Sequence, residues 1–284
     1  MEIHKIMVVG AGKMGRGIAQ VAAYSGIKVL LNDVSPDLVR KALAAVEKSV
    51  NKRIEDGKML EEEKRRIFAN IAVAPDLAQA AEADFLIEAI TENLQLKQDL
   101  FGKMNGICRH EVIFASNTSC LSIDALARSS GRADRFIGMH FFNPVPAMEL
   151  VEIIRGTLTS DRTCETTRAL AERMGKQTVL APNYPGFIVT RVLNAMLKEA
   201  CNCVVEGAKP EDVDKAMKLG CHFPMGPFEL LDLIGLDVAL AVGESMYAVY
   251  GDAKSKPSPL LRNMVDAGLL GRKTGRGFYE YPKD

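Results

Sequence analysis

Short apolar runs alternate with longer amphipathic stretches from the start of the chain to about residue 182. The runs lack the polar alternation of a half-exposed strand, which is typical of strands buried on both faces. Because helical stretches separate them, we predict an α/β fold with a mostly parallel sheet and helices on both faces. The predicted strands are Lys5–Val9, Lys28–Leu31, Ile71–Ala74, Phe85–Glu88, Val112–Ala115, Phe136–Met139, Leu150–Ile154 and Thr178–Leu180.

One interval in this pattern is longer than the others and strongly charged. It runs from Pro36 to Asn70, and we predict a helical-hairpin insert whose turn is Glu55–Lys58. The segment Ala181–Gly186 then breaks the alternation, which favours a domain boundary there. We expect a first domain over residues 1–183 and an all-α domain over residues 184–284. The predicted helices of the second domain are about Phe187–Glu206, one that follows Pro210, Pro227–Ile234, Leu236–Tyr250 and Pro259–Ala267.

Apolar side chains on the predicted helices of the second domain exceed what a small helical bundle normally hides. They include Leu230, Leu231, Leu233, Ile234 and Leu236. We therefore expect a homodimer that forms through this domain.

Composition narrows the class of protein. The 284 residues are 48% hydrophobic and 25% charged with a formal net charge of +0, so no overall field favours nucleic acid or a membrane surface. The six cysteines include no C-x-x-C pair and no zinc-ligand spacing, which indicates reduced thiols and no metal site. The first predicted strand begins almost at the N-terminus, and no apolar run approaches the roughly 18 residues of a membrane helix. We expect a cytoplasmic protein.

A glycine-rich turn follows the first predicted strand and opens a helical stretch. Gly10 allows a tight turn, Gly12 lets the backbone approach a pyrophosphate, and Gly15 lets helix and strand pack closely. Asp33 ends the second strand at about the distance expected for an acid that binds an adenosine ribose. Its charge would repel a 2′-phosphate, so the pattern favours a Rossmann-type fold that binds NAD rather than NADP. The alternative is a plain strand–helix turn with no ligand.

His140 is the best candidate for a proton acceptor among the four histidines. It follows the Phe136–Met139 strand, where ligands of open parallel sheets bind. Glu152 lies on the next strand among apolar neighbours and needs a partner there, which His140 can provide. The hydroxyl-rich segment Ser116–Ser119 follows another strand end and points to the same place. The alternative is a structural histidine, a solvent-facing glutamate and an ordinary turn in which Ser122 caps the next helix.

Seven segments, in order along nearly the whole chain, resemble the L-3-hydroxyacyl-CoA dehydrogenase family, in particular its short branch that acts on 3-hydroxybutyryl-CoA. The resemblance implies an NAD-dependent enzyme of fatty acid or butyrate metabolism that interconverts a short-chain (S)-3-hydroxyacyl-CoA and its 3-ketoacyl-CoA. The segments are Val8–Gly15, Glu88–Asn93, Ala115–Ser119, His140–Pro146, Pro185–Val189, Met225–Asp232 and Gly271–Tyr279.

The resemblance also implies roles for individual residues. His140 would be the general base, Glu152 would hold it, and Ser119 would hydrogen-bond the substrate oxygen. Ser49 and Lys52 of the helical insert would contact CoA. The NAD site would comprise Gly10, Gly12, Lys13, Met14, Gly15, Asp33, Glu92, Lys97, Ser119, Asn143 and Lys273.

Two positions depart from the family's pattern. Thr190 stands where the family usually has a catalytic Asn, and it lacks the reach and the second group of an amide. Asp56 lies near a position where relatives offer a basic residue toward CoA. These departures keep open a related dehydrogenase that acts on another 3-hydroxy acid or thioester. A non-catalytic NAD-binding protein and a methyltransferase are further alternatives, which His140 and Glu152 argue against.

Overall fold

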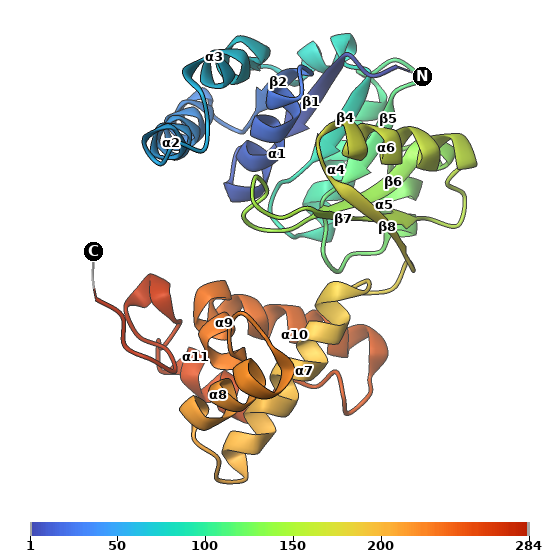
Figure 1. Cartoon of the computed structure of the whole chain (residues 1–284). Coiled ribbons are helices and arrows are strands. Elements are labelled where there is room, and N and C mark those ends of the chain that lie inside the picture. Colours follow the sequence, from blue (N-terminus) through green and yellow to red (C-terminus); the bar gives the residue numbers. More distant parts are fainter. Residues whose placement is uncertain (1, 283–284) are drawn as a thin grey trace. The chain divides into compact units, whose positions relative to one another are not determined.

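The computed structural model describes residues 2–282 and separates into two compact units, one up to Asn183 and one from Tyr184 onward (Figure 1). The first unit contains an eight-stranded sheet in the order β3-β2-β1-β4-β5-β6-β7-β8. Neighbouring strands are parallel except for β6 and β7, as the alternation of strands and helices predicts. The strands are β1 (Lys5–Val9), β2 (Lys28–Asn32), β3 (Ile71–Val73), β4 (Phe85–Glu88), β5 (Ile113–Ser116), β6 (Phe136–Phe141), β7 (Leu150–Arg155) and β8 (Gln177–Ala181).

Helices cover both faces of this sheet, which explains why its central strands read as unbroken apolar runs. On one face Ile6 and Val8 of β1 share a core with side chains of α1, α2 and α6. On the other face Phe101 of α4 packs against Phe114 and Phe136. The helical segments of this unit are α1 (Lys13–Tyr24), α2 (Pro36–Glu55), α3 (Glu61–Asn70), η1 (Leu77–Glu82), α4 (Leu94–Asn105), α5 (Ile123–Ser129), η2 (Ala133–Arg135) and α6 (Asp161–Arg173).

The long charged interval forms the predicted helical hairpin. Helices α2 and α3 run side by side next to the blue strands in Figure 1. The Ser35 hydroxyl accepts a hydrogen bond from the Asp37 amide, and Pro36 occupies the first helical position, so the start of α2 is well defined. The buried side chains of α2 recur at helical spacing, so the charged residues lie on the opposite face. The buried residues are Val39, Ala42, Val46 and Val50.

Strand β6 is longer than the sequence predicts and contains His140 within it. The prediction ended the strand at Met139, whereas the structure continues it to Phe141. The reason is the antiparallel neighbour β7, whose Val151 and Glu152 pair with Phe141 and His140 and so extend the ladder. A strand end inferred from apolar residues alone misses such an extension.

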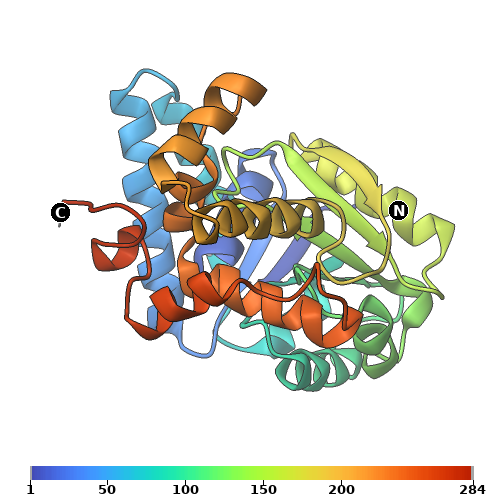
Figure 2. The same ribbon diagram turned by 90° about the horizontal axis from the view of Figure 1, so that it is seen from below.

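The described part of the second unit, up to residue 282, contains helices, loops and two isolated β-bridges, which join Arg276 to Gly271 and to Glu280. Each predicted helix is present, although α7 begins two residues late because Phe187 has a left-handed backbone (φ 46°). Helices α7 and α10 contact each other, and Figure 2 shows them running alongside. The helical segments are α7 (Val189–Val205), α8 (Pro210–Cys221), α9 (Pro227–Ile234), α10 (Leu236–Tyr250), α11 (Pro259–Asp266) and η3 (Arg272–Thr274).

The apolar surface of this unit is smaller than the sequence predicts. Leu231 and Leu236 are buried in the unit's own core with Phe228. Leu233 and Ile234 remain 50% and 37% exposed. In residues 2–282 no single helix has both the length and the apolar character to cross a membrane, and α9 with α10 passes that test only as a pair bent by 95°.

Candidate active site

The glycine-rich turn follows β1 at the edge where the parallel strands end. Gly10 has a positive φ of 102°, and a Cβ there would lie 2.5 Å from the Ala89 carbonyl oxygen. A Cβ on Gly15 would lie 1.7 Å from the Gly10 carbonyl oxygen. These two glycines are therefore required by the protein's own packing.

Gly12 differs from Gly10 and Gly15, because no protein atom lies where its Cβ would be. It has an ordinary φ of −63°, and a Cβ built there would meet no atom within 4 Å. Nothing in the protein requires glycine here, whereas a ligand that approaches the backbone at the start of α1 would. The residues present thus fit a dinucleotide pyrophosphate.

Asp33 lies beside this turn and helps to hold it. Its Oδ2 accepts a 2.6 Å hydrogen bond from the Ala11 amide, and its Oδ1 accepts one of 2.7 Å from the Val34 amide. A carboxylate has about four acceptor positions, so Asp33 retains capacity for ribose hydroxyls.

His140 lies between an acid and a hydroxyl. Its Nδ1 is 2.8 Å from Glu152 Oε2, and its Nε2 is 3.1 Å from Ser119 Oγ. The imidazole is 5% exposed and Glu152 is fully buried. Because β6 and β7 are antiparallel with His140 and Glu152 in direct register, the backbone itself places the two side chains together. The contact expected between these residues is present.

The side chains of the four polar residues Ser116–Ser119, at the end of β5, contact four different residues. Ser116 donates to Glu88 Oε2 at 2.6 Å, and Asn117 Oδ1 accepts from the Phe141 amide at 2.9 Å, next to His140. Thr118 donates to Glu92 Oε1 at 2.5 Å. Ser119 contacts His140, so this segment is more than an ordinary turn, although the predicted cap of α5 by Ser122 is also present.

Glu92 holds the segment that carries Ser119. Besides Thr118, its Oε1 accepts hydrogen bonds from the amides of Ser119 (2.9 Å) and Cys120 (3.2 Å). Its Oε2 lies 3.3 Å from Nζ of Lys97, a lysine only 1% exposed. Two residues expected at the NAD site therefore also position Ser119.

Glu88 forms a buried ion pair with Lys97. Its Oε1 lies 2.5 Å from Lys97 Nζ and accepts a 2.7 Å hydrogen bond from the Ile90 amide. Burial raises the pKa of the Glu88 carboxyl, and the Lys97 ammonium opposes that rise. The buried pair ties the end of β4 to the segment that follows it.

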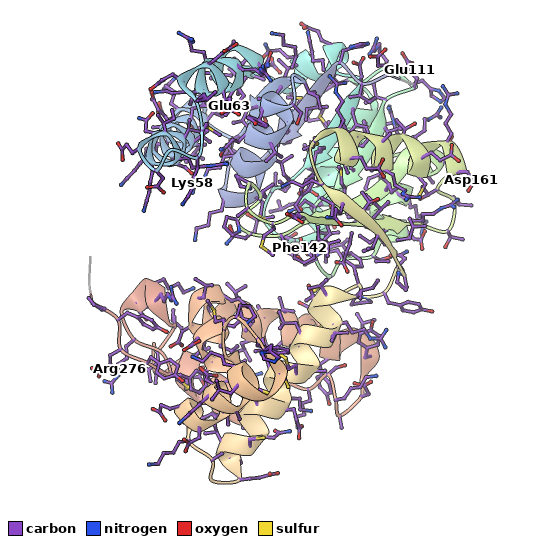
Figure 3. The ribbon with its side chains drawn as sticks, in the orientation of Figure 1. Lys58, Glu63, Glu111, Phe142, Asp161 and Arg276 are labelled. Carbon is purple, nitrogen blue, oxygen red and sulfur yellow. The ribbon has the colours of Figure 1, made fainter. Side chains whose placement is uncertain are left out.

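Phe142 contacts the other side of the imidazole. Its ring centroid is 4.6 Å from that of His140 at a tilt of 58°, and Figure 3 labels it beyond the end of β6. The aromatic ring therefore packs against the imidazole.

The remaining predicted residues lie elsewhere. Lys13, Ser49 and Asn143 line one cavity in the first unit, and Lys52 lines a groove along α2. Met14 is half-buried in the first turn of α1. Thr190 lies in the first turn of α7 and Lys273 pairs with Asp237, both in the second unit.

Sequence reasoning missed Glu88 and the separate roles of Ser116 and Asn117. The available signal was an acid that ends an otherwise apolar strand, nine positions before Lys97. A buried carboxylate requires a partner, so that pattern predicts an ion pair.

Comparisons with known proteins cover nearly the whole chain. The model "3-hydroxyacyl-CoA dehydrogenase, NAD binding domain" matches residues 5–184, and "3-hydroxyacyl-CoA dehydrogenase, C-terminal domain" matches residues 186–281. A probable 3-hydroxybutyryl-CoA dehydrogenase of Deinococcus radiodurans is 50% identical over 98% of this chain and 100% of its own. A probable 3-hydroxybutyryl-CoA dehydrogenase of Bacillus subtilis is 48% identical over 99% of this chain and 98% of its own length. The crystal structure of (S)-3-hydroxybutyryl-CoA dehydrogenase from Ralstonia eutropha matches with a TM-score of 0.95 at 47% identity. The match covers 99% of this chain and 100% of the other.

The open space at Gly12 gives a test that separates ligand contact from folding. In Gly12→Ala the melting temperature of the free protein should change by less than about 2 °C, because the new Cβ meets no atom of the protein. Its affinity for NADH, measured by fluorescence titration, should fall about tenfold or more. Gly15→Ala is the control that should destabilise the fold. Wild-type NADH affinity in Gly12→Ala would show that the cofactor does not approach this turn.

Proposed function

The chain belongs to the 3-hydroxyacyl-CoA dehydrogenase family, and from that membership we propose that it interconverts a short-chain (S)-3-hydroxyacyl-CoA and its 3-ketoacyl-CoA. The cofactor is NAD. We propose 3-hydroxybutyryl-CoA as the main substrate, which the names of the bacterial relatives support. The observation that carries the proposal is the contact of His140 with both Glu152 and Ser119.

In the oxidising direction, His140 Nε2 takes the proton of the substrate's C3 hydroxyl as the C3 hydride leaves. Bound NAD supplies the acceptor for that hydride. In this proposal Glu152 accepts the Nδ1–H of the same ring, so Nε2 carries no proton and can accept that of the substrate, and the charge of Glu152 stabilises the imidazolium that forms. The Ser119 hydroxyl donates to the substrate oxygen as it becomes a carbonyl.

The groups that would hold NAD are those of the glycine-rich turn, with Asp33 at the ribose. Glu92, Lys97 and Asn143 of the first unit complete the proposed set. Glu92 and Lys97 would serve both the cofactor and Ser119, which their contacts support. Loss of either should therefore weaken NADH binding and slow turnover together.

Substitution of the acid tests the proposed base directly. Glu152→Gln keeps the size of the side chain and removes its charge, and His140→Asn removes the base. We expect each to lower kcat for NADH oxidation with acetoacetyl-CoA by about 10²–10⁴-fold, with the NADH dissociation constant nearly unchanged. Glu149→Gln, at an exposed acid before β7, is the control. Near-normal turnover in His140→Asn would eliminate this residue as the base.

A second candidate function is a related dehydrogenase that acts on another 3-hydroxy acid or thioester, and Thr190 favours it. If the CoA thioester is the substrate, Thr190→Asn should leave kcat with acetoacetyl-CoA similar or higher, because the amide adds reach and a second polar group. Steady-state assays of both proteins with acetoacetyl-CoA, longer 3-ketoacyl-CoA and free 3-hydroxybutyrate distinguish the two functions. A collapse of activity in Thr190→Asn would show that Thr190 serves a different substrate.

We also propose a homodimer through the second unit. Leu233 and Ile234 of α9 and Val238 of α10 are more than a third exposed, and exposed apolar side chains of this kind favour an interface. Light scattering on a gel-filtration column should give twice the chain mass of 31.0 kDa. Ile234→Lys with Val238→Lys should shift the protein toward monomer, and a wild-type monomer would contradict the proposal.

A further inference from the structure

Two hollows of the first unit meet at Arg16. The first is a cavity of about 310 Å³ between α1, α2 and the segment Asn143–Pro146. The second is an open groove of about 840 Å³ along α2 toward Asp56. Arg16, Ala45 and Ser49 line both of them, so the two form one continuous depression.

Arg16 is half-buried and has no counter-ion. Among residues 2–282 no carboxylate pairs with its guanidinium and no group accepts a hydrogen bond from that guanidinium. The acids of the groove are either paired elsewhere, as Glu47 is with Lys64 at 3.0 Å, or not within reach of the guanidinium. A guanidinium is always charged, so its burial without a partner of opposite charge is unfavourable. An anionic ligand would satisfy it.

The charges along α2 indicate where that anion lies. Lys48 and Lys52 lie on the turns nearest Ser49, whereas Glu55 and Asp56 lie at the far end of the helix. Asp56 is seven residues beyond Ser49, which is about 10 Å along a helix. An anion is therefore attracted to the Arg16 and Ser49 end and repelled from the Asp56 end.

Gly17 gives the cavity a wall on the side of the loop after β6. A Cβ on this residue would lie 2.8 Å from Val145 Cβ, so glycine lets Val145 pack directly onto α1. Arg16 is the neighbouring residue on α1, and it lines both hollows.

We propose that Arg16 and the Ser49 hydroxyl together bind a phosphate group of the acyl-CoA nucleotide at this junction. The proposal rests on the proposed function and adds to it the residue that recognises the charged end of the substrate. The planar guanidinium donates two parallel hydrogen bonds to phosphate oxygens, and the serine hydroxyl adds a third. Lys48 and Lys52 contribute longer-range attraction, and Asp56 limits how far along the groove the phosphate lies.

The test compares a substrate that carries phosphates with one that lacks them. Arg16→Gln should raise KM for acetoacetyl-CoA about five- to tenfold with kcat unchanged, and change KM for acetoacetyl-pantetheine less than about twofold. By calorimetry the dissociation constant of CoA alone should rise by the same factor, while that of NADH stays constant. Arg16→Lys should restore part of the CoA affinity. Lys41→Gln, an exposed cation of α2 outside both hollows, is the control.

Three results would overturn the proposal. Unchanged CoA affinity in Arg16→Gln, with wild-type turnover of acetoacetyl-CoA, would refute the role of Arg16 and leave the proposed function intact. An equal rise in KM for both thioesters would place Arg16 at the acyl or pantetheine part. A loss of NADH affinity alone would assign the guanidinium to the dinucleotide. If the wild type does not turn over acetoacetyl-CoA, the proposed function fails, and the calorimetry with CoA still decides the role of Arg16.

Discussion

The pairing of His140 with Glu152 is the interaction on which the rest of the site depends. A fully buried carboxylate is stable only when it is paired or hydrogen-bonded, and the imidazole is a partner that β6 places directly across from it. The antiparallel register places both side chains through the backbone of β6 and β7, so their contact does not depend on the conformation of a loop. The same contact fixes which ring nitrogen faces Ser119 and the proposed substrate.

Neighbouring strand ends support this pair through a second set of charged groups, of which Glu88 and Lys97 are buried. Glu88 at the end of β4 holds Lys97, Lys97 contacts Glu92, and Glu92 binds the segment that carries Ser119. Glu88 and Lys97 satisfy each other's charges, which would otherwise be unfavourable in the interior. The Ser119 hydroxyl next to His140 is therefore positioned indirectly, because the ion pairs of Lys97 hold Glu92 and Glu92 binds the backbone amide of Ser119. In the proposed function, the same residues would both bind the cofactor and position Ser119.

The sequence predicts the scaffold well because strands buried on both faces leave unbroken apolar runs. The eight strands, the α2–α3 hairpin and the helices after Pro210 follow from such runs and from proline and glycine positions. The partners of Glu88 and Asn117 are not predictable in this way, because they depend on which strands become neighbours. The extension of β6 was missed for the same reason. Leu231 and Leu236, which the sequence counts among the excess apolar side chains, are buried, because helical spacing alone does not show which neighbours cover a side chain.

The tautomer of His140 tests the central claim most directly. A ¹⁵N spectrum of histidine-labelled protein at alkaline pH, assigned by comparison with His140→Asn, reports which ring nitrogen carries the proton. The account predicts a proton on Nδ1, toward Glu152, and a bare Nε2 toward Ser119. A proton on Nε2 in the free enzyme would contradict it, because the nitrogen that faces Ser119 would then be unable to accept a proton.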